Sequence, residues 1–440
     1  MLNRKNTDTD IIVIGGGPSG SIAAALLAQD GYEVVLLDKC KHPRPSVGES
    51  LIPYFWQFCD KAGATQAVER AGFVKKAGGI VAWGDTVHKI SLADFGFQKP
   101  ALHVERDLFD KILLDNAGDR GVDIRELCHV TNVELNDTGI SNVSYINTVS
   151  NETVELTGRY IIDASGQSSV VANQYGFREF DEGFRFSAIW GYYRDGQYLS
   201  SAGNACRLNQ VYDIPPATFV ESTEGWGWTW HIALRDSISV GIIIPIERFA
   251  ALKKAGESRE AIFKRLVSQG PRLSQLVKYN DFIEGSASFL RDYAYKPKKL
   301  FLKNCLLIGD AAAFVDPVNS AGVTFGMYAA CLAATVIDNS LKQPRKQGYY
   351  QSVFESMYRS RLDLFRLIAY PDHKRDESMF EGSSNIINMH SKRDLQLVLT
   401  QAVVVNRYQG LFERVRKAGM DPEALIGSLN GNFELNFNIS

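Results

Sequence analysis

The chain has 440 residues and a formal net charge of −2, so it can bury a large core in two joined domains or in one elaborated domain. The near-neutral charge offers no basic stripe for nucleic acid, and six cysteines without C-x-x-C spacing favour neither a metal site nor a disulfide framework. The sequence has no run of about 18 apolar residues that would predict a membrane span and no apolar N-terminal segment typical of a secretory signal, so we expect a cytoplasmic protein.

Residues 10–38 predict a dinucleotide-binding βαβ unit. An apolar strand leads into G-G-G-P-S-G at residues 15–20, and a helix is expected over residues 21–29. Gly15 permits a tight turn, Gly17 lets the backbone approach a pyrophosphate, and Gly20 allows close packing of helix on strand. Asp38 follows a second strand at residues 34–37, where a carboxylate can accept a ribose hydroxyl, and Ser19 is expected to contact the same cofactor. A purely structural glycine turn is the alternative.

Two later segments are expected to return to the same sheet as parallel strands. Residues 158–166 are apolar until Asp163, and residues 300–313 repeat the pattern with Gly309 and Asp310 before small residues. Ligands of open α/β sheets bind at the carboxyl ends of the strands, so we expect these three residues to contact the cofactor. For Asp310, a helix N-cap is the alternative. Helices are predicted at about residues 54–62 and 106–120.

The remaining patterns complete an α/β fold class. Residues 78–90 and 188–245 contain short aromatic and β-branched runs between Gly, Asp and Ser, which predict antiparallel strands that meet in one sheet. We therefore expect a discontinuous Rossmann-like cofactor domain at residues 1–77, 100–187 and 290–330. An antiparallel-sheet substrate domain is expected at residues 78–99 and 188–289, and a helical C-terminal region at residues 331–440, with a break at Tyr370-Pro371-Asp372.

Several motifs together resemble the FAD-dependent monooxygenase superfamily with a para-hydroxybenzoate-hydroxylase-like fold. The glycine fingerprint, the strand end at Asp163 and the Gly309-Asp310 pair match three of its motifs in order, which implies FAD as the cofactor. Residues 47–53 (V-G-E-S-L-I-P), 72–78 (G-F-V-K-K-A-G) and 83–84 (W-G) are similar to the flavin-dependent halogenases of the phenol and pyrrole type. Residues 228–233 resemble their W-x-W-x-I-P signature, and residues 314–322 match F-x-x-P-x-x-S-x-G in full.

The resemblance implies a specific reaction. Reduced FAD from a separate flavin reductase reacts with O2 to a C4a-hydroperoxide, which oxidises a halide ion to hypohalous acid. A lysine relays this acid to an electron-rich aromatic, such as a phenol or a pyrrole, free or tethered to a carrier protein or a peptide. By its place in F-x-x-K-x-G, Lys76 is the candidate, and burial readily shifts the pKa of a lysine. Lys75 is the adjacent rival, and two ordinary surface lysines are the alternative.

The resemblance also implies roles in substrate and halide binding. Trp228 and Trp230 alternate along one strand and are expected to keep the substrate away from the flavin, with core packing as the alternative. Trp226 widens this aromatic strip. Backbone N–H groups of Ala321 and Gly322 would hold the halide or the flavin.

Other residues are assigned by their positions in the matched motifs. Ser320, in the F-x-x-P-x-x-S-x-G motif, is expected to take part in catalysis. Further flavin contacts are expected from Ser50, Arg106 and Pro317, with a surface arginine as the alternative for Arg106. Asn319 stands where tryptophan-type halogenases carry a glutamate, which favours a substrate that is already electron-rich. His231, opposite the tryptophans on its strand, is expected to be structural.

Two other functions are compatible with parts of this pattern. Ala233 stands where the W-x-W-x-I-P signature has proline, so a flavin monooxygenase that hydroxylates an aromatic ring, including one on a protein or peptide, is the alternative. A reductive flavoprotein similar to geranylgeranyl reductases would share the fold and the Gly-Asp strand end. The F-x-x-K-x-G motif and the tryptophan pair disfavour that third reading.

Overall fold

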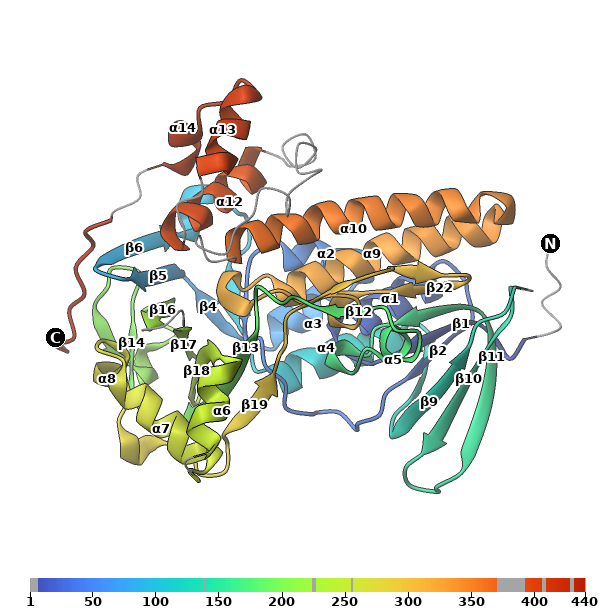
Figure 1. The fold of residues 1–440 in the computed structure, drawn as a ribbon, viewed down its shortest axis with the longest axis horizontal. Coiled ribbons are helices and arrows are strands. Elements are labelled where there is room, and N and C mark those ends of the chain that lie inside the picture. The colour runs from blue at the N-terminus through green and yellow to red at the C-terminus, as the bar shows by residue number, and fades with distance from the viewer. Residues whose placement is uncertain are drawn as a thin grey trace.

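The computed structural model describes residues 7–137, 139–223, 227–254, 256–369, 392–405, 409–427 and 431–439. Trp226 and the break predicted at Tyr370-Pro371-Asp372 lie outside these residues. The described residues form one large sheet with its helices at one end and a second large sheet at the other (Figure 1). Each helix in the described ranges is too short or too polar to cross a membrane.

The first sheet has the parallel core that the sequence predicts. Its path is β21 (Phe301–Leu302), β22 (Cys305–Leu307), β11 (Thr153–Asp163), β1 (Thr9–Ile14), β2 (Val34–Leu37) and β8 (Asp123–Arg125). Strand β1 runs parallel to both β2 and β11, and β22 runs parallel to β11. Strands β9 (Cys128–Glu134) and β10 (Ser141–Asn147) add an antiparallel extension to β11. Every residue of β1 and β2 is buried, as expected for a sheet covered on both faces.

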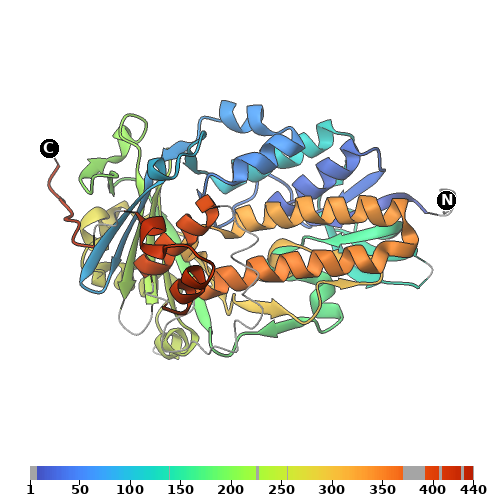
Figure 2. The ribbon, with the colours of Figure 1, turned by 90° about the horizontal axis from the view of Figure 1, so that it is seen from above.

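Helices cover this sheet and fix the direction of its loops. They are α1 (Pro18–Gln29), α2 (Phe55–Ala62), α3 (Thr65–Arg70), α4 (Arg106–Asp119), α5 (Val170–Gln174), α9 (Gly322–Lys342) and α10 (Gln347–Ala369). Figure 2 shows α9 and α10 side by side along the length of the molecule. Buried alanines on α1 and α9 let these two helices approach each other closely over the nucleotide-binding loop.

A three-stranded sheet lies between the two large sheets. Its order is β3 (Ser50–Leu51), β7 (Ala101–His103) and β4 (Val74–Lys76), with both pairs antiparallel. Strands of two or three residues carry no readable periodicity, which is why the sequence did not predict this sheet.

The second large sheet joins the two blocks predicted as strands. Among the described residues its order is β19 (Ser288–Arg291), β13 (Phe186–Tyr193), β18 (Ile238–Pro245), β17 (Gly227–Ala233), β16 (Ala217–Thr223), β5 (Gly78–Trp83) and β6 (Thr86–Ser91). The prediction that both blocks meet in one sheet is confirmed. The prediction of antiparallel pairing is wrong at the junction, because β16 and β5 run parallel with Ala217 opposite Gly78. No hairpin joins them, so no short turn constrains their relative direction.

Short elements complete the region around this sheet. Helices α6 (Ile246–Lys254), α7 (Arg259–Gln269) and α8 (Leu273–Leu276), which the sequence analysis did not identify, pack apolar side chains on one face of the sheet. Two small strand pairs connect it to the rest of the fold: β12 (Arg178–Phe180) with β20 (Tyr295–Pro297), and β14 (Gln197–Leu199) with β15 (Ala205–Arg207).

The C-terminal region is helical only in part. Helices α12 (Lys392–Val405), α13 (Gln409–Lys417) and α14 (Pro422–Ile426) lie beyond β5 and β6 (Figures 1 and 2). The helical prediction is wrong for residues 431–439, which are extended and form bridges to Val87 in the second sheet and to Asn204 in the turn between β14 and β15. The reason is the alternating pattern of Phe433, Leu435 and Phe437, which presents every second side chain to the core of that sheet.

Candidate active site

The glycine loop has the shape that a dinucleotide requires. Gly15 has φ +109°, and a Cβ there would lie 2.3 Å from the Ala164 carbonyl oxygen. A Cβ on Gly20 would lie 1.9 Å from the Gly15 carbonyl oxygen, so helix α1 packs directly on the loop. A Cβ on Gly17 would meet only the Arg44 guanidinium, at 3.6 Å. The loop is therefore closed at two glycines and open at the third, which fits a pyrophosphate approaching at Gly17.

Asp38 and Arg44 flank this loop. The Asp38 carboxylate accepts hydrogen bonds from the backbone N–H groups of Gly16 at 2.6 Å and Cys40 at 2.7 Å. It therefore holds the loop in place, and its contact to a ribose stays a prediction. Arg44, 3.7 Å from the Asp110 carboxylate, brings a cation to the start of α1. Sequence reasoning missed Arg44, because a single cation in a loop carries no specific signal.

The strand ends at Asp163 and Asp310 have different environments. The Asp163 carboxylate is fully buried and accepts the backbone N–H groups of Ser165 at 3.0 Å and Val171 at 2.7 Å. It therefore shapes the strand end, and its contact to the cofactor stays a prediction. Asp310 is half-buried, lies inside the 3₁₀ turn η6 (Gly309–Ala311) rather than at its N-cap, and accepts a hydrogen bond from Gln167 at 3.4 Å. Burial raises the pKa of Asp310 to about 6.

Ser19 joins the glycine loop to the second strand end. Its hydroxyl oxygen occupies the space that a side chain on Gly309 or Gly326 would need. A Cβ built on Gly309 would lie 2.6 Å from this oxygen, and a Cβ built on Gly326 would lie 2.3 Å from it. The Ser19 hydroxyl therefore fills the space where the loop, the turn η6 and helix α9 meet, and Gly309 and Gly326 leave room for it. This close contact explains why small residues are required at all three places.

Arg106 and Glu49 organise the loop before β3. The buried Arg106 guanidinium binds Asp110 at 2.8 and 3.0 Å and also donates to the carbonyl of Val47. The alternative of a surface arginine is therefore wrong, and a direct flavin contact stays a prediction. Glu49 is buried, accepts the Tyr192 hydroxyl at 2.7 Å, and has a raised pKa because of burial. Its second oxygen has no hydrogen-bond partner among the described residues.

The three-stranded sheet places Lys76 in the interior. His103 stands opposite Ser50 on one side and Val74 on the other. Directly opposed residues share a face of a sheet, and so do residues two apart on one strand. Lys76 therefore joins Ser50 and His103 on the buried face, with 8% of its surface exposed, whereas Lys75 points to solvent. Of the two candidate lysines, only Lys76 faces the interior.

Hydrogen bonds connect Lys76 to two loops. Its Nζ donates to the Ser50 hydroxyl at 2.8 Å, and the Ser320 hydroxyl donates to the same oxygen at 2.9 Å. Burial lowers the pKa of Lys76 to about 7, so amine and ammonium forms both exist near neutral pH. Ser50 also bonds Thr218 at 3.0 Å. A serine hydroxyl has one donor and two acceptor positions, and these three bonds occupy all of them. The flavin contact of Ser50 stays a prediction.

Trp228 and Trp230 lie on the face of the second sheet that carries Thr218. Trp230 stands opposite Val220, two residues from Thr218, whereas His231 stands opposite Phe219 on the other face. The prediction of both indoles on one face is confirmed. Their ring centroids are 5.9 Å apart and both are buried. The Trp230 ring lies over Gly241, where a Cβ would come within 2.0 Å of it.

The loop at residues 314–322 packs against these indoles and leads into α9. Pro317 begins the 3₁₀ turn η7 (Pro317–Asn319), Ala321 precedes α9 and Gly322 is its first residue. Asp316, which sequence reasoning missed, accepts the Val318 N–H at 3.0 Å and the Tyr293 hydroxyl at 2.6 Å.

Comparison with known proteins places the chain in a family. It matches the tryptophan halogenase family over residues 10–99 and 88–416. The chain belongs to this family. The resemblance to flavin-dependent halogenases predicted from the motifs is thereby confirmed, and so is the α/β fold class.

Similar proteins named as halogenases or chlorinases support this placement. The chain is 31% identical to a tryptophan 2-halogenase of Chondromyces crocatus over 80% of its own length, and it spans 66% of that relative. It is 27% identical to a 1H-pyrrole-2-carbonyl-[peptidyl-carrier protein] chlorinase of Pseudomonas fluorescens, with 76% and 77% of the two chains covered. The solved structure of the myxobacterial chondrochloren halogenase matches with a TM-score of 0.72 and 27% identity, and covers 90% of this chain and 97% of the other.

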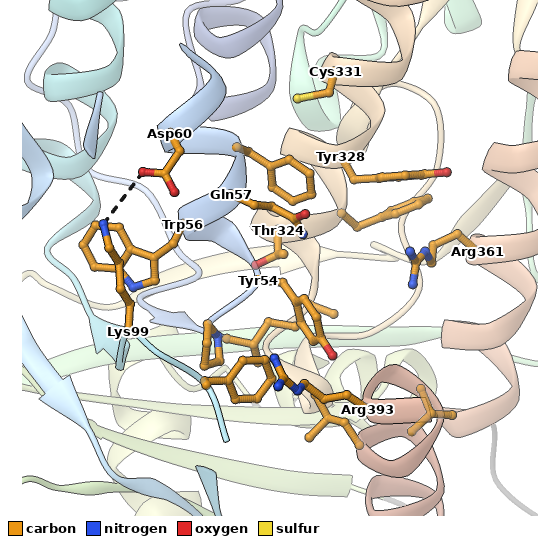
Figure 3. Close-up of a pocket in the computed structure, with 18 of the residues that line it drawn as sticks. Tyr54, Trp56, Gln57, Asp60, Lys99, Thr324, Tyr328, Cys331, Arg361 and Arg393 are labelled. Atoms are coloured by element: carbon orange, nitrogen blue, oxygen red, sulfur yellow. Dashed lines mark ion pairs between the residues drawn. The ribbon is translucent and has the colours of Figure 1, made fainter. Parts of the chain in front are cut away.

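A cavity of about 730 Å³ is lined by residues that include Tyr54, Trp56, Tyr328 and Arg361 (Figure 3), and by Ala321, which follows Ser320 in the chain. Ala321 and Thr324 form one wall, and aromatic and aliphatic side chains of α2, α9, α10 and α12 form the others. Its lining also includes the cationic side chains of Lys61, Lys99, Arg361 and Arg393 and the carboxylate of Asp60. The cavity of this halogenase-family member is thus apolar with a cationic margin. Among the described residues, no three His, Cys, Asp or Glu side chains are placed to hold a metal ion.

Proposed function

We propose that this chain is a flavin-dependent halogenase that acts on an electron-rich aromatic such as a phenol or a pyrrole. The observation that carries the proposal is the placement of Lys76, a buried lysine with a pKa of about 7 whose Nζ donates to Ser50 beside Ser320. Family membership and the relatives that halogenate aromatic rings support it.

The cofactor in this proposal is FAD, reduced by a separate flavin reductase. The loop that is open at Gly17, with Arg44 beside it, would hold the pyrophosphate. Asp38 and Asp310 would face the ribose and ribityl hydroxyls, and Arg106 would hold the loop that borders the ring system. When bound, reduced FAD with O2 supplies the oxidising equivalent that converts a halide ion into hypohalous acid.

Lys76 would hold the hypohalous acid next to the substrate. Its ammonium would donate a hydrogen bond to the acid's oxygen and, as the oxygen–halogen bond breaks and a ring carbon takes the halogen, give that oxygen the proton with which it leaves as water. The proton that the ring then loses would return to the neutral amine, so no net proton is consumed at Lys76. The N–H groups of Ala321 and Gly322 at the start of α9 would hold the halide ion, because a helix N-terminus favours anions.

The substrate would enter through the cavity bounded by Ala321 and Thr324. Its apolar walls suit an aromatic ring, and its cationic margin suits an anionic group, which is compatible with a free acid or with a substrate tethered to a carrier protein or a peptide. The buried pair Trp228 and Trp230 would separate the substrate from the flavin.

A flavin monooxygenase that hydroxylates the ring is the second candidate. The observation that favours it is Ala233 at the position where the halogenase signature has proline. In the structure, the backbone carbonyl of Ala233 accepts a hydrogen bond from His103 Nδ1 at 2.9 Å. A proline would offer the same carbonyl, so this contact does not distinguish the two functions.

The test is mass spectrometry of an electron-rich aromatic panel, free and carrier-tethered, after incubation with the chain, FAD, a flavin reductase, air and bromide. We expect a bromine isotope doublet that Lys76→Ala abolishes, by a factor of about 100 or more. Lys75→Ala is the matched control and should retain the product, because that side chain points to solvent. A product with one added oxygen that forms equally without bromide would instead establish the hydroxylase.

A further inference from the structure

A chain of three buried polar side chains extends beyond Lys76. Ser50 contacts Thr218 at 3.0 Å between the two hydroxyls, and Thr218 contacts His103 Nε2 at 2.8 Å. His103 Nδ1 is 2.9 Å from the carbonyl oxygen of Ala233. His103 is fully buried, and Ser50 and Thr218 are each 6% exposed. The chain connects the short sheet that carries Lys76 to the strand β17 that carries the two tryptophans.

The backbone carbonyl fixes the direction of every bond in this chain. A carbonyl oxygen only accepts, so the hydrogen of the His103 ring lies on Nδ1. Burial, with the nearby Lys76 and His231 as smaller causes, lowers the pKa of His103 to about 3, so the ring is neutral and Nε2 accepts. Thr218 must then donate to Nε2, and its oxygen accepts from Ser50.

Ser50 can consequently act only as an acceptor toward its other two partners, Lys76 and Ser320. Its single hydrogen is committed to Thr218, so its oxygen accepts from both Lys76 and Ser320. Burial is the cause that lowers the pKa of Lys76, and His103 is the titratable group of this cluster that faces it. An oxygen that can only accept favours the charged form of Lys76 and opposes the effect of burial.

We propose that His103 and Thr218 are positioning residues for Lys76. Together they orient the Ser50 hydroxyl so that it accepts one N–H of Lys76 and cannot donate to it, which holds the amine in one orientation and keeps its ammonium form accessible. The Ala233 carbonyl fixes the imidazole tautomer on which this depends. The consequence for halogenation rests on the proposed function, whereas the hydrogen-bond arrangement can be tested without it.

The first test compares Thr218→Val with Thr218→Ser in the full chain. Valine removes the hydroxyl at nearly constant shape, so Ser50 is free to donate to the neutral amine. We expect the titration midpoint of Lys76, followed by ¹³Cε NMR of lysine-labelled protein and assigned with Lys76→Met, to fall by about half a pH unit or more. Thr218→Ser keeps the hydroxyl and should titrate as the wild type. A valine variant that titrates as the wild type, or a serine variant that shifts equally, would overturn the proposal.

The second test needs no variant at these positions. The ¹⁵N shifts of the His103 ring distinguish a hydrogen on Nδ1 from one on Nε2, and we expect the Nδ1–H form throughout about pH 5 to 9. The other tautomer, or a ring that becomes charged in this range, contradicts the proposed directions.

A third arm links the arrangement to the reaction. In the bromide assay, Thr218→Val should shift the pH profile of product formation to lower pH, and Thr218→Ser should restore it. If the NMR results are as expected but neither variant nor wild type brominates any substrate, the positioning role holds and the proposed function fails.

Discussion

At the scale of single residues, Lys76 is a lysine whose charged form is costly to bury and whose amine is held in a defined position. Its pKa of about 7 lies well below the usual value of a lysine, because the buried ammonium is separated from water. Three elements supply what surrounds the amine: β3 carries Ser50, β7 carries His103, and the loop before α9 carries Ser320. A catalytic relay needs an amine of this kind, near half protonation and fixed in space.

The same pKa predicts how stability depends on pH. The folded chain releases the Lys76 proton near pH 7 and the unfolded chain near pH 10.5, so the unfolded state binds more protons between these values. Stability from this site therefore rises with pH across that window, by about 1.4 kcal/mol per unit at most. Lys76→Met removes this dependence. We expect urea unfolding to show that the unfolding free energy of the variant rises relative to that of the wild type as the pH falls from 10 to 7. This pH window is set by the same two pKa values.

Lys75→Met is the control for this measurement. Its side chain is exposed, so the difference in unfolding free energy from the wild type should be small and independent of pH. If the difference in unfolding free energy between Lys76→Met and the wild type is also independent of pH, Lys76 is not buried, which would contradict the structure.

At the scale of elements, the βαβ unit was predictable because its physics is local. A strand, three glycines, a helix and a second strand follow one another within about thirty residues, and each glycine has a separate reason. The short sheet of β3, β7 and β4 was not predictable, since its strands come from three separate parts of the chain and are too short to show alternation.

The different roles of the loop glycines lead to an element-scale prediction. Gly20→Ala forces its Cβ to within 1.9 Å of the Gly15 carbonyl, so α1 must move, and we expect a loss of about 1–3 kcal/mol in unfolding free energy or a failure to fold. Gly17→Ala meets only a guanidinium at 3.6 Å and has an ordinary φ of −73°. It should keep the wild-type stability and weaken FAD binding alone.

Thermal unfolding and a titration of FAD fluorescence separate these two effects. Equal loss of stability in both variants would show that Gly17 is a packing glycine, and unchanged FAD binding in Gly17→Ala would remove the proposed pyrophosphate contact. The pair therefore distinguishes a fold requirement from a ligand requirement within one loop.

At the scale of the whole molecule, the last described segment returns to the second sheet. Phe433 donates its backbone N–H to Val87 at 3.1 Å, Asn436 bonds Gly203 at 2.9 Å, and the Phe433 ring lies against Gly203. This segment thus ties the described end of the chain to β6 and to the loop after β14. The parts that carry the proposed site are held together by contacts between residues distant in sequence.

This arrangement predicts a measurable contribution from the C-terminal segment. Phe433→Ala should lower the unfolding free energy by about 1–3 kcal/mol, because it removes a ring that packs against the apolar core of the second sheet. Ile439→Ala, at a side chain that is 39% exposed, should change it by less than about 0.5 kcal/mol. Urea unfolding of both variants checks this, and equal effects would show that the segment is not docked as described.

The sequence by itself determined the features that depend on neighbours along the chain. The glycine loop, the parallel strands ending at Asp163 and Gly309, the alternation of Trp228 and Trp230, and the motif position of Lys76 all follow from local spacing. Spacing is sufficient there because backbone geometry fixes which side chains share a strand face or a turn.

Only the tertiary structure decided which distant residues meet. It brings strands from four separate segments of the chain together. On this depend the parallel pairing of β5 with β16 and the burial of Lys76 rather than Lys75. The same contacts create the hydrogen bonds from Lys76 through Ser50 and Thr218 to His103. No local pattern marks His103 or Thr218, because their importance lies in the direction of hydrogen bonds across sheets. That direction is set by the backbone carbonyl of Ala233. Every residue type has such a carbonyl, so the residue at position 233 gives no sign of this role.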